Sequence, residues 1–253
     1  MTDHILIERP EACPGVLVIR FNRPEKKNAI TKAMYQKMTA GLLEGETDPA
    51  IRTIALLGTE GCFSAGNDMA DFLAYAMAGT VDQPAAFEVL KAIWSVSKPV
   101  VSGVDGLAIG IGTTINMHCD MTIASDRSLF RTPFVDLALV PEAGSSLLAP
   151  RMMGQQRAFA LLAAGEGFSA AEAKDAGLIW KVVAPEAVEP ETLKLAASLA
   201  AKPPEAMRIT RDLLRGDRGE LLARMEEELT YFIERLKSAE AMASFQSFMK
   251  GRG

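Results

Sequence analysis

The chain has 253 residues, of which 49% are hydrophobic and 23% charged, and its formal net charge is −5. This composition is typical of a globular protein with one sizeable core. Acidic and basic residues are interspersed, so the sequence offers no basic face for nucleic acid. The three scattered cysteines and two histidines favour neither a disulfide framework nor a metal site.

The N-terminal sequence and the length of the apolar runs indicate where in the cell the protein is expected. The first ten residues lack the basic and apolar regions of a signal peptide. No run of 18 consecutive apolar residues occurs in the sequence. We therefore expect a cytoplasmic protein without a membrane partner.

Hydrophobic patterns predict alternating strands and helices over the first two thirds of the chain. Apolar runs or alternation between turn residues indicate strands, and apolar residues every three or four positions indicate helices. The first two strands flank Pro14-Gly15 and should form a β-hairpin. The predicted strands are residues 5–8, 16–21, 53–58, 98–104, 121–124, 129–130 and 178–183. The predicted helices are residues 31–46, a helix that begins near residue 68, and residues 84–96, 111–118, 132–139, 141–151 and 169–177, with Thr31 and Ser169 as N-caps.

The last quarter of the chain has a different pattern. Residues from about 186 to 250 are almost entirely helical in periodicity, with breaks at 202–204 and 215–219. We therefore predict an α/β core over residues 1–185 and a helical region over residues 186–253.

The segment from Asp105 to Asp120 is the first candidate for a functional site. A buried strand precedes it, and Gly106, Gly110 and Gly112 lead into a short apolar helix. Such a turn can aim free backbone N–H groups and the positive end of a helix dipole at a phosphate or an oxyanion. The segment has neither the dinucleotide-binding nor the P-loop spacing. A tight turn that packs a helix on a sheet would have the same residues, so the segment alone leaves both interpretations open.

Four motifs in order resemble those of the crotonase (enoyl-CoA hydratase/isomerase) superfamily. They are Asn22-Arg-Pro-Glu-Lys-Lys-Asn-Ala-Ile, Phe63-Ser-Ala-Gly-Asn-Asp-Met, Gly106-Leu-Ala-Ile-Gly-Ile-Gly and Ala170-Ala-Glu-Ala-Lys-Asp-Ala-Gly-Leu-Ile. The resemblance covers nearly the whole chain. It implies a spiral of ββα repeats with a C-terminal helical trimerisation region. It further implies a homotrimer or hexamer that acts on an acyl-CoA thioester, with CoA as part of the substrate and no separate cofactor.

In this superfamily, one backbone N–H from each glycine loop holds the thioester oxygen. Matching the motifs residue by residue places these donors at Ala65 and Ile111. Many relatives have glycine where this chain has Ile111, and we expect its side chain to narrow the pocket. Two such donors stabilise the oxygen of an enolate, and loss of one typically costs about 10²–10³ in rate.

The acids of the family hydratases are missing. The resemblance places their two glutamates at positions that here hold Thr114 and Phe134, neither of which can activate water at neutral pH. One acid remains, Glu142, in a Pro-Glu-Ala-Gly segment similar to that of peroxisomal-type Δ3,Δ2-enoyl-CoA isomerases. An isomerase needs only one base, which moves a proton from C2 to C4. The alternative for Glu142 is an ordinary helix start, where an acid complements the dipole.

Further residues are candidates for substrate binding by resemblance, and Asp136 is a reserve acid. The acyl pocket is expected around Met69, Phe72, Leu73 and Met77. The functions that stay open are an isomerase, a hydratase-like enzyme and a non-catalytic acyl-CoA-binding homologue. The substrate-binding candidates are Lys26, Lys27, Ala29, Ser64, Gly66, Asn67, Asp68, Gly110, Gly112, Phe134 and Phe245.

Overall fold

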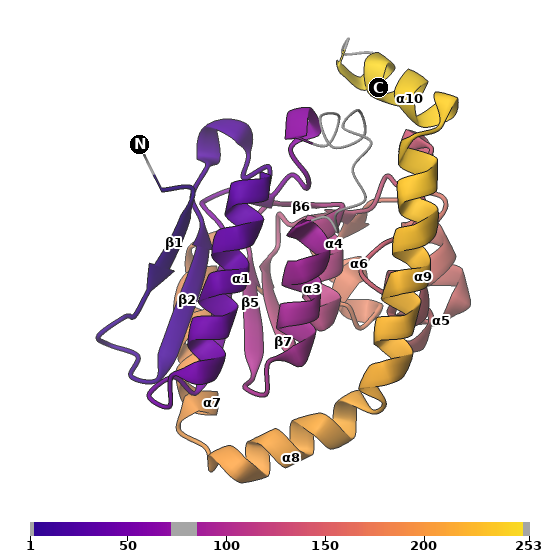
Figure 1. Cartoon of the computed structure of the whole chain (residues 1–253). Coiled ribbons are helices and arrows are strands. Elements are labelled where there is room, and N and C mark those ends of the chain that lie inside the picture. Colours follow the sequence, from indigo (N-terminus) through magenta and orange to yellow (C-terminus); the bar gives the residue numbers. More distant parts are fainter. Residues whose placement is uncertain (1–2, 72–84, 250–253) are drawn as a thin grey trace.

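Two β-sheets form the centre of the protein in the computed structural model, which describes residues 3–71 and 85–249 (Figure 1). The larger sheet is mostly parallel, and only its first two strands pair antiparallel. Its six strands, in spatial order, are β1 (Ile5–Glu8), β2 (Val16–Phe21), β3 (Thr53–Leu57), β5 (Val100–Val104), β7 (Met121–Ser125) and β10 (Lys181–Val183). The four strands of the smaller sheet are β4 (Cys62–Ser64), β6 (Leu107–Ile109), β8 (Leu129–Arg131) and β9 (Phe168–Ser169).

The chain passes from one sheet to the other in each repeat. β3, β5 and β7 lie in the larger sheet, and each is followed by a short strand, β4, β6 or β8, in the smaller sheet. This is the spiral of ββα repeats that the resemblance implied. The predicted hairpin is confirmed as β1 and β2. β4, β6 and β9 were not predicted, because strands of two or three residues beside glycine-rich turns show no clear period.

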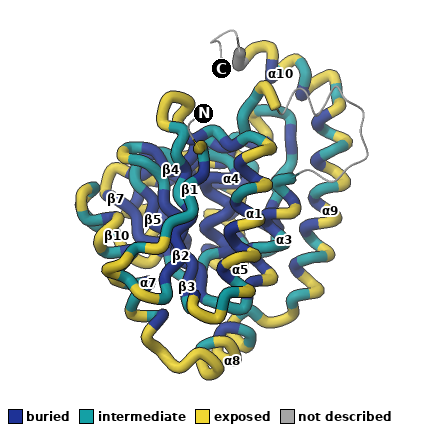
Figure 2. The backbone as a smooth tube through the Cα atoms, turned by 60° about the vertical axis from the view of Figure 1, so that its left-hand side comes forward, coloured by how far each residue is buried: buried dark blue, intermediate teal, exposed yellow. Residues whose placement is uncertain are grey.

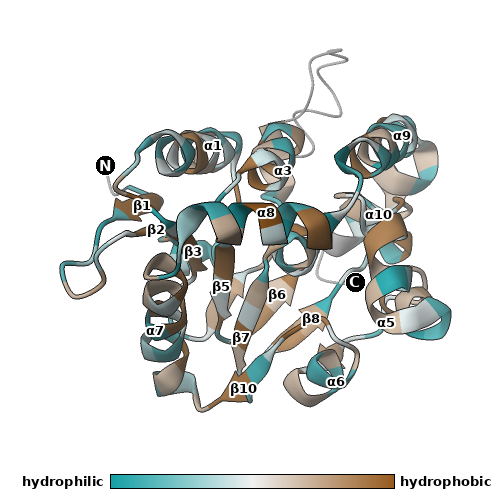
Figure 3. Cartoon of the chain, turned by 90° about the horizontal axis from the view of Figure 1, so that it is seen from below, coloured by the Kyte–Doolittle hydropathy of each residue, from teal (hydrophilic) through white to brown (hydrophobic). Residues whose placement is uncertain are grey.

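Helices cover both faces of the larger sheet (Figure 3). α1 (Lys32–Thr47) and α3 (Ala85–Ser95) lie on one face, and α7 (Val188–Ala200) lies on the other. Thr31 caps α1 by accepting the N–H of Met34, as predicted. Ser169 and Glu172 form a complete capping box at α6. The other helices described before residue 204 are η1 (Pro24–Lys26), α4 (Ile111–Thr114), η2 (Ile115–His118), η3 (Val135–Leu137), α5 (Ser145–Leu162), α6 (Ala170–Asp175) and η4 (Pro185–Ala187).

The strands of the larger sheet read as continuous apolar runs because both of their faces are buried. Along β2, Leu17 and Ile19 point into the cluster on one face, whereas Val16 and Val18 point into the cluster beneath α7. This alternation follows from the two-residue period of a strand. α7 therefore packs on the sheet, although it follows the predicted boundary at residue 186.

The C-terminal helices reach away from the sheets. α8 (Pro204–Arg215) runs along one end of the molecule, where most of its residues are exposed (Figure 2). α9 (Arg218–Leu236) and α10 (Ala239–Met249) follow, with a break at Lys237-Ser238 that was not predicted. Arg211 anchors α8 to the core through a 2.7 Å hydrogen bond from its Nε to Asp120. Within the described ranges, no helix has the length and apolar character needed to span a membrane.

Candidate active site

The two glycine-bearing loops lie side by side, because the strands that lead into them are neighbours. β4 pairs with β6 in parallel, with Ser64 opposite Ala108. Gly66 has a φ of 89°, and a Cβ at this position would lie 2.8 Å from the Ile109 carbonyl oxygen. A Cβ at Gly112 would lie 2.7 Å from the Ser64 carbonyl oxygen. Glycine is therefore required on both sides of this contact.

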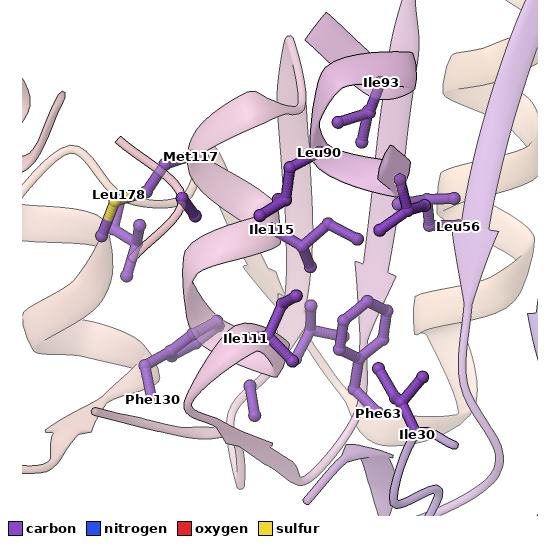
Figure 4. Close-up of a cluster of buried hydrophobic side chains, with 14 of the residues drawn as sticks. Ile30, Leu56, Phe63, Leu90, Ile93, Ile111, Ile115, Met117, Phe130 and Leu178 are labelled. Atoms are coloured by element: carbon purple, nitrogen blue, oxygen red, sulfur yellow. The ribbon is translucent and has the colours of Figure 1, made fainter. Parts of the chain in front are cut away.

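Ile111 presents only its backbone at this contact. It is the first residue of α4, where an N–H has no acceptor within the helix. Its side chain is 1% exposed and lies in the core near Phe63 (Figure 4). The expectation that this side chain narrows the pocket is wrong, because the side chain points into the core.

Ala65 is poorly placed to supply the second donor. Its N–H donates a 2.9 Å hydrogen bond to the Lys27 carbonyl. The neighbouring Gly66 N–H donates to the Ser64 hydroxyl, which in turn donates to the Asn28 carbonyl. The geometry therefore does not support Ala65 as a donor to a substrate, and Ser64 is buried within the loop.

The backbone N–H of Asn67 differs in its direction from the N–H groups of Ala65 and Gly66. The Ile30 N–H donates to the Gly66 carbonyl, and the Asp68 N–H donates to the Ile30 carbonyl. These are the two bonds of a parallel bridge centred on Ile30 and Asn67. Ile30 makes both bonds, to the two neighbours of Asn67, so the N–H of Asn67 itself takes no part in the bridge and faces away from the partner strand. The Asn67 N–H therefore points away from Ile30.

The side chains of Asn67 and Asp68, both candidates for substrate binding, are held within the protein by hydrogen bonds that shape this loop. Tyr35 on α1 donates a 2.7 Å hydrogen bond to the Asn67 Oδ1. Asp68 accepts from Arg23 at 2.6 Å and from the N–H of Ala70 at 3.0 Å. Both residues fix the loop and the start of the helical turn that follows it.

The loop over residues 22–30 lies directly against the first glycine loop. Asn28 is fully buried, and its Nδ2 donates to the carbonyl oxygens of Cys62 and Phe63. Sequence analysis assigned no role to Asn28, whose place in a polar loop gave no sign of burial. Lys26 and Lys27 are exposed beside it, and Ala29 is half-buried. The loop thus places two cationic side chains near the glycine loops.

Glu142 lies in a turn before α5 and not in its first helical turn. α5 begins at Ser145, and the intervening Ala143 and Gly144 have φ angles of 65° and 67°. The prediction of a helix over residues 141–151 was therefore wrong at its start. The ordinary explanation of Glu142, an acid in the first turn of a helix, does not apply.

Thr114 holds the carboxyl of Glu142. Its hydroxyl donates a 2.6 Å hydrogen bond to the Glu142 Oε1. Thr114 is completely buried and lies on α4, three residues after Ile111. The acid thus reaches the position at which the family hydratases have their first glutamate.

Burial raises the pKa of Glu142, the hydrogen bond from Thr114 lowers it, and the negative charge of Glu228 raises it; the net result is a pKa of about 7. A carboxyl with this pKa can accept and return a proton at neutral pH. Burial raises the pKa of the Tyr35 phenol, and the charge of Glu142 adds to this effect. Glu142 is thus within electrostatic range of the side chain that holds Asn67.

Other predicted residues lie away from this arrangement. Phe134 is buried in the core. Phe245 is also fully buried in the core, which does not support its expected contact with a substrate. Asp136 is exposed and pairs with Arg131 at 3.0 Å. Of the proposed acyl-pocket residues, Met69 packs against the core. Phe72, Leu73 and Met77 lie outside the described residues.

Two other features do not belong to this site. Burial raises the pKa of the Cys62 thiol to about 11, and the thiol donates to the Lys27 carbonyl, so Cys62 is not an activated nucleophile. A cavity of about 450 Å³ opens at the ends of β3 and β5, where Thr59, Asp105 and Arg127 contribute to its lining. None of the predicted site residues lines this cavity.

Comparison with known proteins agrees with the fold and the motifs. Residues 11–252 match the family model described as enoyl-CoA hydratase/isomerase. The chain is 36% identical over 242 residues, 93% of its length, to enoyl-CoA delta isomerase 2 of Rattus norvegicus, but it spans only 61% of that protein. It is 31% identical over 246 residues, 96% of its length and 95% of the relative, to a probable enoyl-CoA hydratase of Rhodobacter capsulatus. The structure superimposes with a TM-score of 0.91 and 35% identity on an enoyl-CoA hydratase/isomerase from Pseudoalteromonas atlantica, covering 99% of this chain and 98% of that one. The chain belongs to the enoyl-CoA hydratase/isomerase family.

Proposed function

We propose that this protein is a Δ3,Δ2-enoyl-CoA isomerase with Glu142 as its single acid–base group. The observation that carries the proposal is the pair of Thr114 and Glu142. The carboxyl is held at 2.6 Å by a neutral hydroxyl, and burial raises its pKa to about 7. The name of the relative from Rattus norvegicus agrees with this activity.

The reaction needs one base that reaches two carbons. The Glu142 carboxylate takes a proton from C2 of a 3-enoyl thioester, and the electron pair of that C–H bond moves onto the thioester oxygen. The protonated Glu142 then delivers the proton to C4, and the double bond comes to lie between C2 and C3. A pKa near the operating pH suits a group that acts first as base and then as acid.

We assign the enolate oxygen to the backbone N–H groups of Asn67 and Ile111. The Ile111 N–H lies at the start of a helix, and the Asn67 N–H points away from the strand that pairs with its neighbours. This assignment replaces Ala65, whose N–H already has an acceptor. Lys26 and Lys27 are exposed beside these loops and are proposed to bind the phosphates of CoA.

A hydratase-like activity is the second candidate, because the relative from Rhodobacter capsulatus is named as a probable hydratase. Hydration needs one group that activates water and another that delivers a proton. The two positions that hold these acids in family hydratases are here a threonine hydroxyl and a buried phenyl ring. We therefore expect hydration to be slow compared with isomerisation.

The test compares two substrates with the wild type and Glu142→Gln. We expect the wild type to convert 3-hexenoyl-CoA to the 2-enoyl product and to hydrate crotonyl-CoA much more slowly. Glu142→Gln should bind CoA thioesters but lose the isomerisation. Full activity in this variant would remove Glu142 from its role. Tight CoA binding without turnover by the wild type would identify a non-catalytic homologue.

A further inference from the structure

The turn that carries Glu142 is closed locally by a 3.1 Å hydrogen bond from the Ser145 N–H to the Glu142 carbonyl, but its backbone conformation is strained. Ala143 and Gly144 are both left-handed, with φ angles of 65° and 67°, and an alanine rarely adopts this conformation. Gly144 is the N-cap residue of α5 and provides no side chain to satisfy the first N–H groups of that helix. The N–H groups of Gly144 and Ser146 therefore need acceptors from elsewhere in the chain.

Glu228 on α9 supplies the missing cap. Its Oε2 accepts the Gly144 N–H at 2.6 Å, and its Oε1 accepts the Ser146 N–H at 2.9 Å. The side chain is only 6% exposed, so these bonds lie in the interior of the protein. One carboxylate thus does from a distant helix what an N-cap side chain does locally.

α9 also packs closely on this turn. A Cβ at Gly144 would overlap the side chain of Leu221, which lies two turns before Glu228 on the same helix. The close approach leaves room for glycine alone at position 144. The position of the turn is therefore fixed by α9.

His118 also binds the backbone of this turn. Its Nε2 donates a 2.7 Å hydrogen bond to the Ala143 carbonyl. Burial lowers the pKa of His118 to about 4, so the ring is neutral at pH 7 and its proton lies on Nε2, facing the carbonyl. Nδ1 has no hydrogen-bond partner among the described residues. The Trp94 ring packs edge-on at 6.1 Å between centroids and fixes the plane of the imidazole.

We propose that Glu228 and His118 are positioning residues that clamp the turn over residues 142–146 and so direct the Glu142 carboxyl toward Thr114 and the substrate. Together they bind the carbonyl of Ala143 and the N–H groups of Gly144 and Ser146, three backbone groups directly after Glu142. This inference rests on the proposed role of Glu142 as the proton shuttle. It adds two residues that contact neither the substrate nor the reacting carbons.

The charge of Glu228 has a second effect on Glu142. It is a source of the raised pKa of Glu142, besides burial. The groups that face Glu228 are the N–H groups of the turn, the Ser146 side chain, Glu142 beyond them, and Arg224 one turn earlier on α9. Burial raises the pKa of Glu228, whereas its hydrogen bonds to Ser146 and Gly144 and the charge of Arg224 oppose this effect and favour the ionised form. The removal of this negative charge should make Glu142 a weaker base.

The experiment measures kcat, KM and the pH dependence of kcat on 3-hexenoyl-CoA for Glu228→Gln and His118→Phe. Each variant removes a hydrogen bond to the turn, and we expect kcat to fall about tenfold with KM within about twofold of the wild type. In Glu228→Gln the apparent pKa of the kcat profile should also decrease. Glu226→Gln, an exposed acid on the same helix, is the control and should leave both quantities unchanged.

Rescue separates positioning from a general loss of stability. Glycine adopts a positive φ readily, so Ala143→Gly should favour the turn even without the hydrogen bond from His118. We expect the double variant His118→Phe/Ala143→Gly to recover most of the kcat lost in His118→Phe. A double variant no more active than His118→Phe would contradict the role of His118.

A titration without turnover makes the test independent of the proposed activity. Glutamate labelled with ¹³C at the side-chain carboxyl allows NMR titration of Glu142, assigned by its absence in Glu142→Gln. A decrease in the Glu142 pKa in Glu228→Gln but not in Glu226→Gln supports the clamp even if the wild type lacks isomerase activity. An unchanged titration and an unchanged kcat in both clamp variants would overturn the proposal. If Glu228→Gln does not fold, the comparison of kcat between His118→Phe and His118→Phe/Ala143→Gly tests the proposal.

Discussion

Thr114 donates a 2.6 Å hydrogen bond to Glu142, although 28 residues separate them in the sequence. The bond joins the helix that follows the second glycine loop to the turn before α5. It favours the ionised carboxylate and so opposes the effect of burial, which favours the protonated acid. The pKa of about 7 is the balance of these two effects together with the charge of Glu228.

Thr114→Val should make Glu142 harder to ionise. Valine fills the same buried space but donates no hydrogen bond, so the pKa of Glu142 should rise above 7. We expect kcat/KM at pH 7 to fall roughly fivefold to tenfold and to recover as the pH is raised. Thr114→Ser keeps the hydroxyl and should keep the wild-type pH profile. A Thr114→Val profile identical to that of the wild type would show that the hydrogen bond does not control this ionisation.

Glu142→Gln should change how stability depends on pH. Since the pKa of Glu142 is raised from 4.5 to about 7 on folding, its stabilising contribution is complete below pH 4.5 and is lost as the pH rises through 7. Glutamine does not ionise, so the variant should gain up to about 3 kcal/mol over the wild type between pH 5 and pH 8. Urea denaturation at both pH values measures this difference. A difference in the free energy of unfolding between variant and wild type that is the same at both pH values would contradict the raised pKa.

The sequence revealed features that depend on neighbouring residues. The hairpin of β1 and β2 and the caps at Thr31 and Ser169 follow from turn and cap residues within a few positions. The short strands β4 and β6 could not be predicted in this way, because their glycine-rich ends resemble loops. Their pairing depends on contacts between successive repeats of the spiral, and no local pattern reports such contacts.

The site itself was only partly predictable. The motifs led to Glu142, but Glu228 lies 84 residues from the N–H that it binds, and no pattern connects them. The choice between Ala65 and Asn67 depends on the direction of an N–H, and the positive φ of Gly66 between them breaks the regular alternation of an extended strand. Only the hydrogen bonds to Lys27 and Ile30 distinguish the two residues.

Ile111→Ala should affect stability more than substrate choice. Its side chain is 1% exposed in the core, so truncation leaves a cavity and should lower the free energy of unfolding by about 2–5 kcal/mol. Ile111→Val removes one methylene group and should cost about 0.5–1.5 kcal/mol. Chemical denaturation gives both values, and KM for short and long 3-enoyl-CoA substrates should not change. An altered chain-length preference with unchanged stability would place this side chain in the pocket.

Gly66→Ala should separate the two glycine loops. The new Cβ would lie 2.8 Å from the Ile109 carbonyl oxygen at a residue whose φ is 89°. The resulting shift would move the Asn67 N–H away from Ile111, and loss of one such donor typically costs about 10²–10³ in kcat. Gly154→Ala is the control, since Gly154 has a φ of 77° but open space around its Cβ position. Equal losses in the two variants would mean that backbone strain, and not the loop contact, causes the effect.

We propose that α8 contributes to a subunit interface. Leu213 and Leu214 on this helix are 78% and 83% exposed, and Ile209, one turn earlier, is 45% exposed. Apolar side chains gathered on one exposed helix indicate a surface that a partner covers. Leu213→Glu/Leu214→Glu should therefore convert an oligomer to a monomer in light scattering after size exclusion. Leu43→Glu changes another exposed leucine, on α1, and should leave the mass unchanged. A wild type that is itself monomeric, or a double variant that still assembles, would rule out this interface.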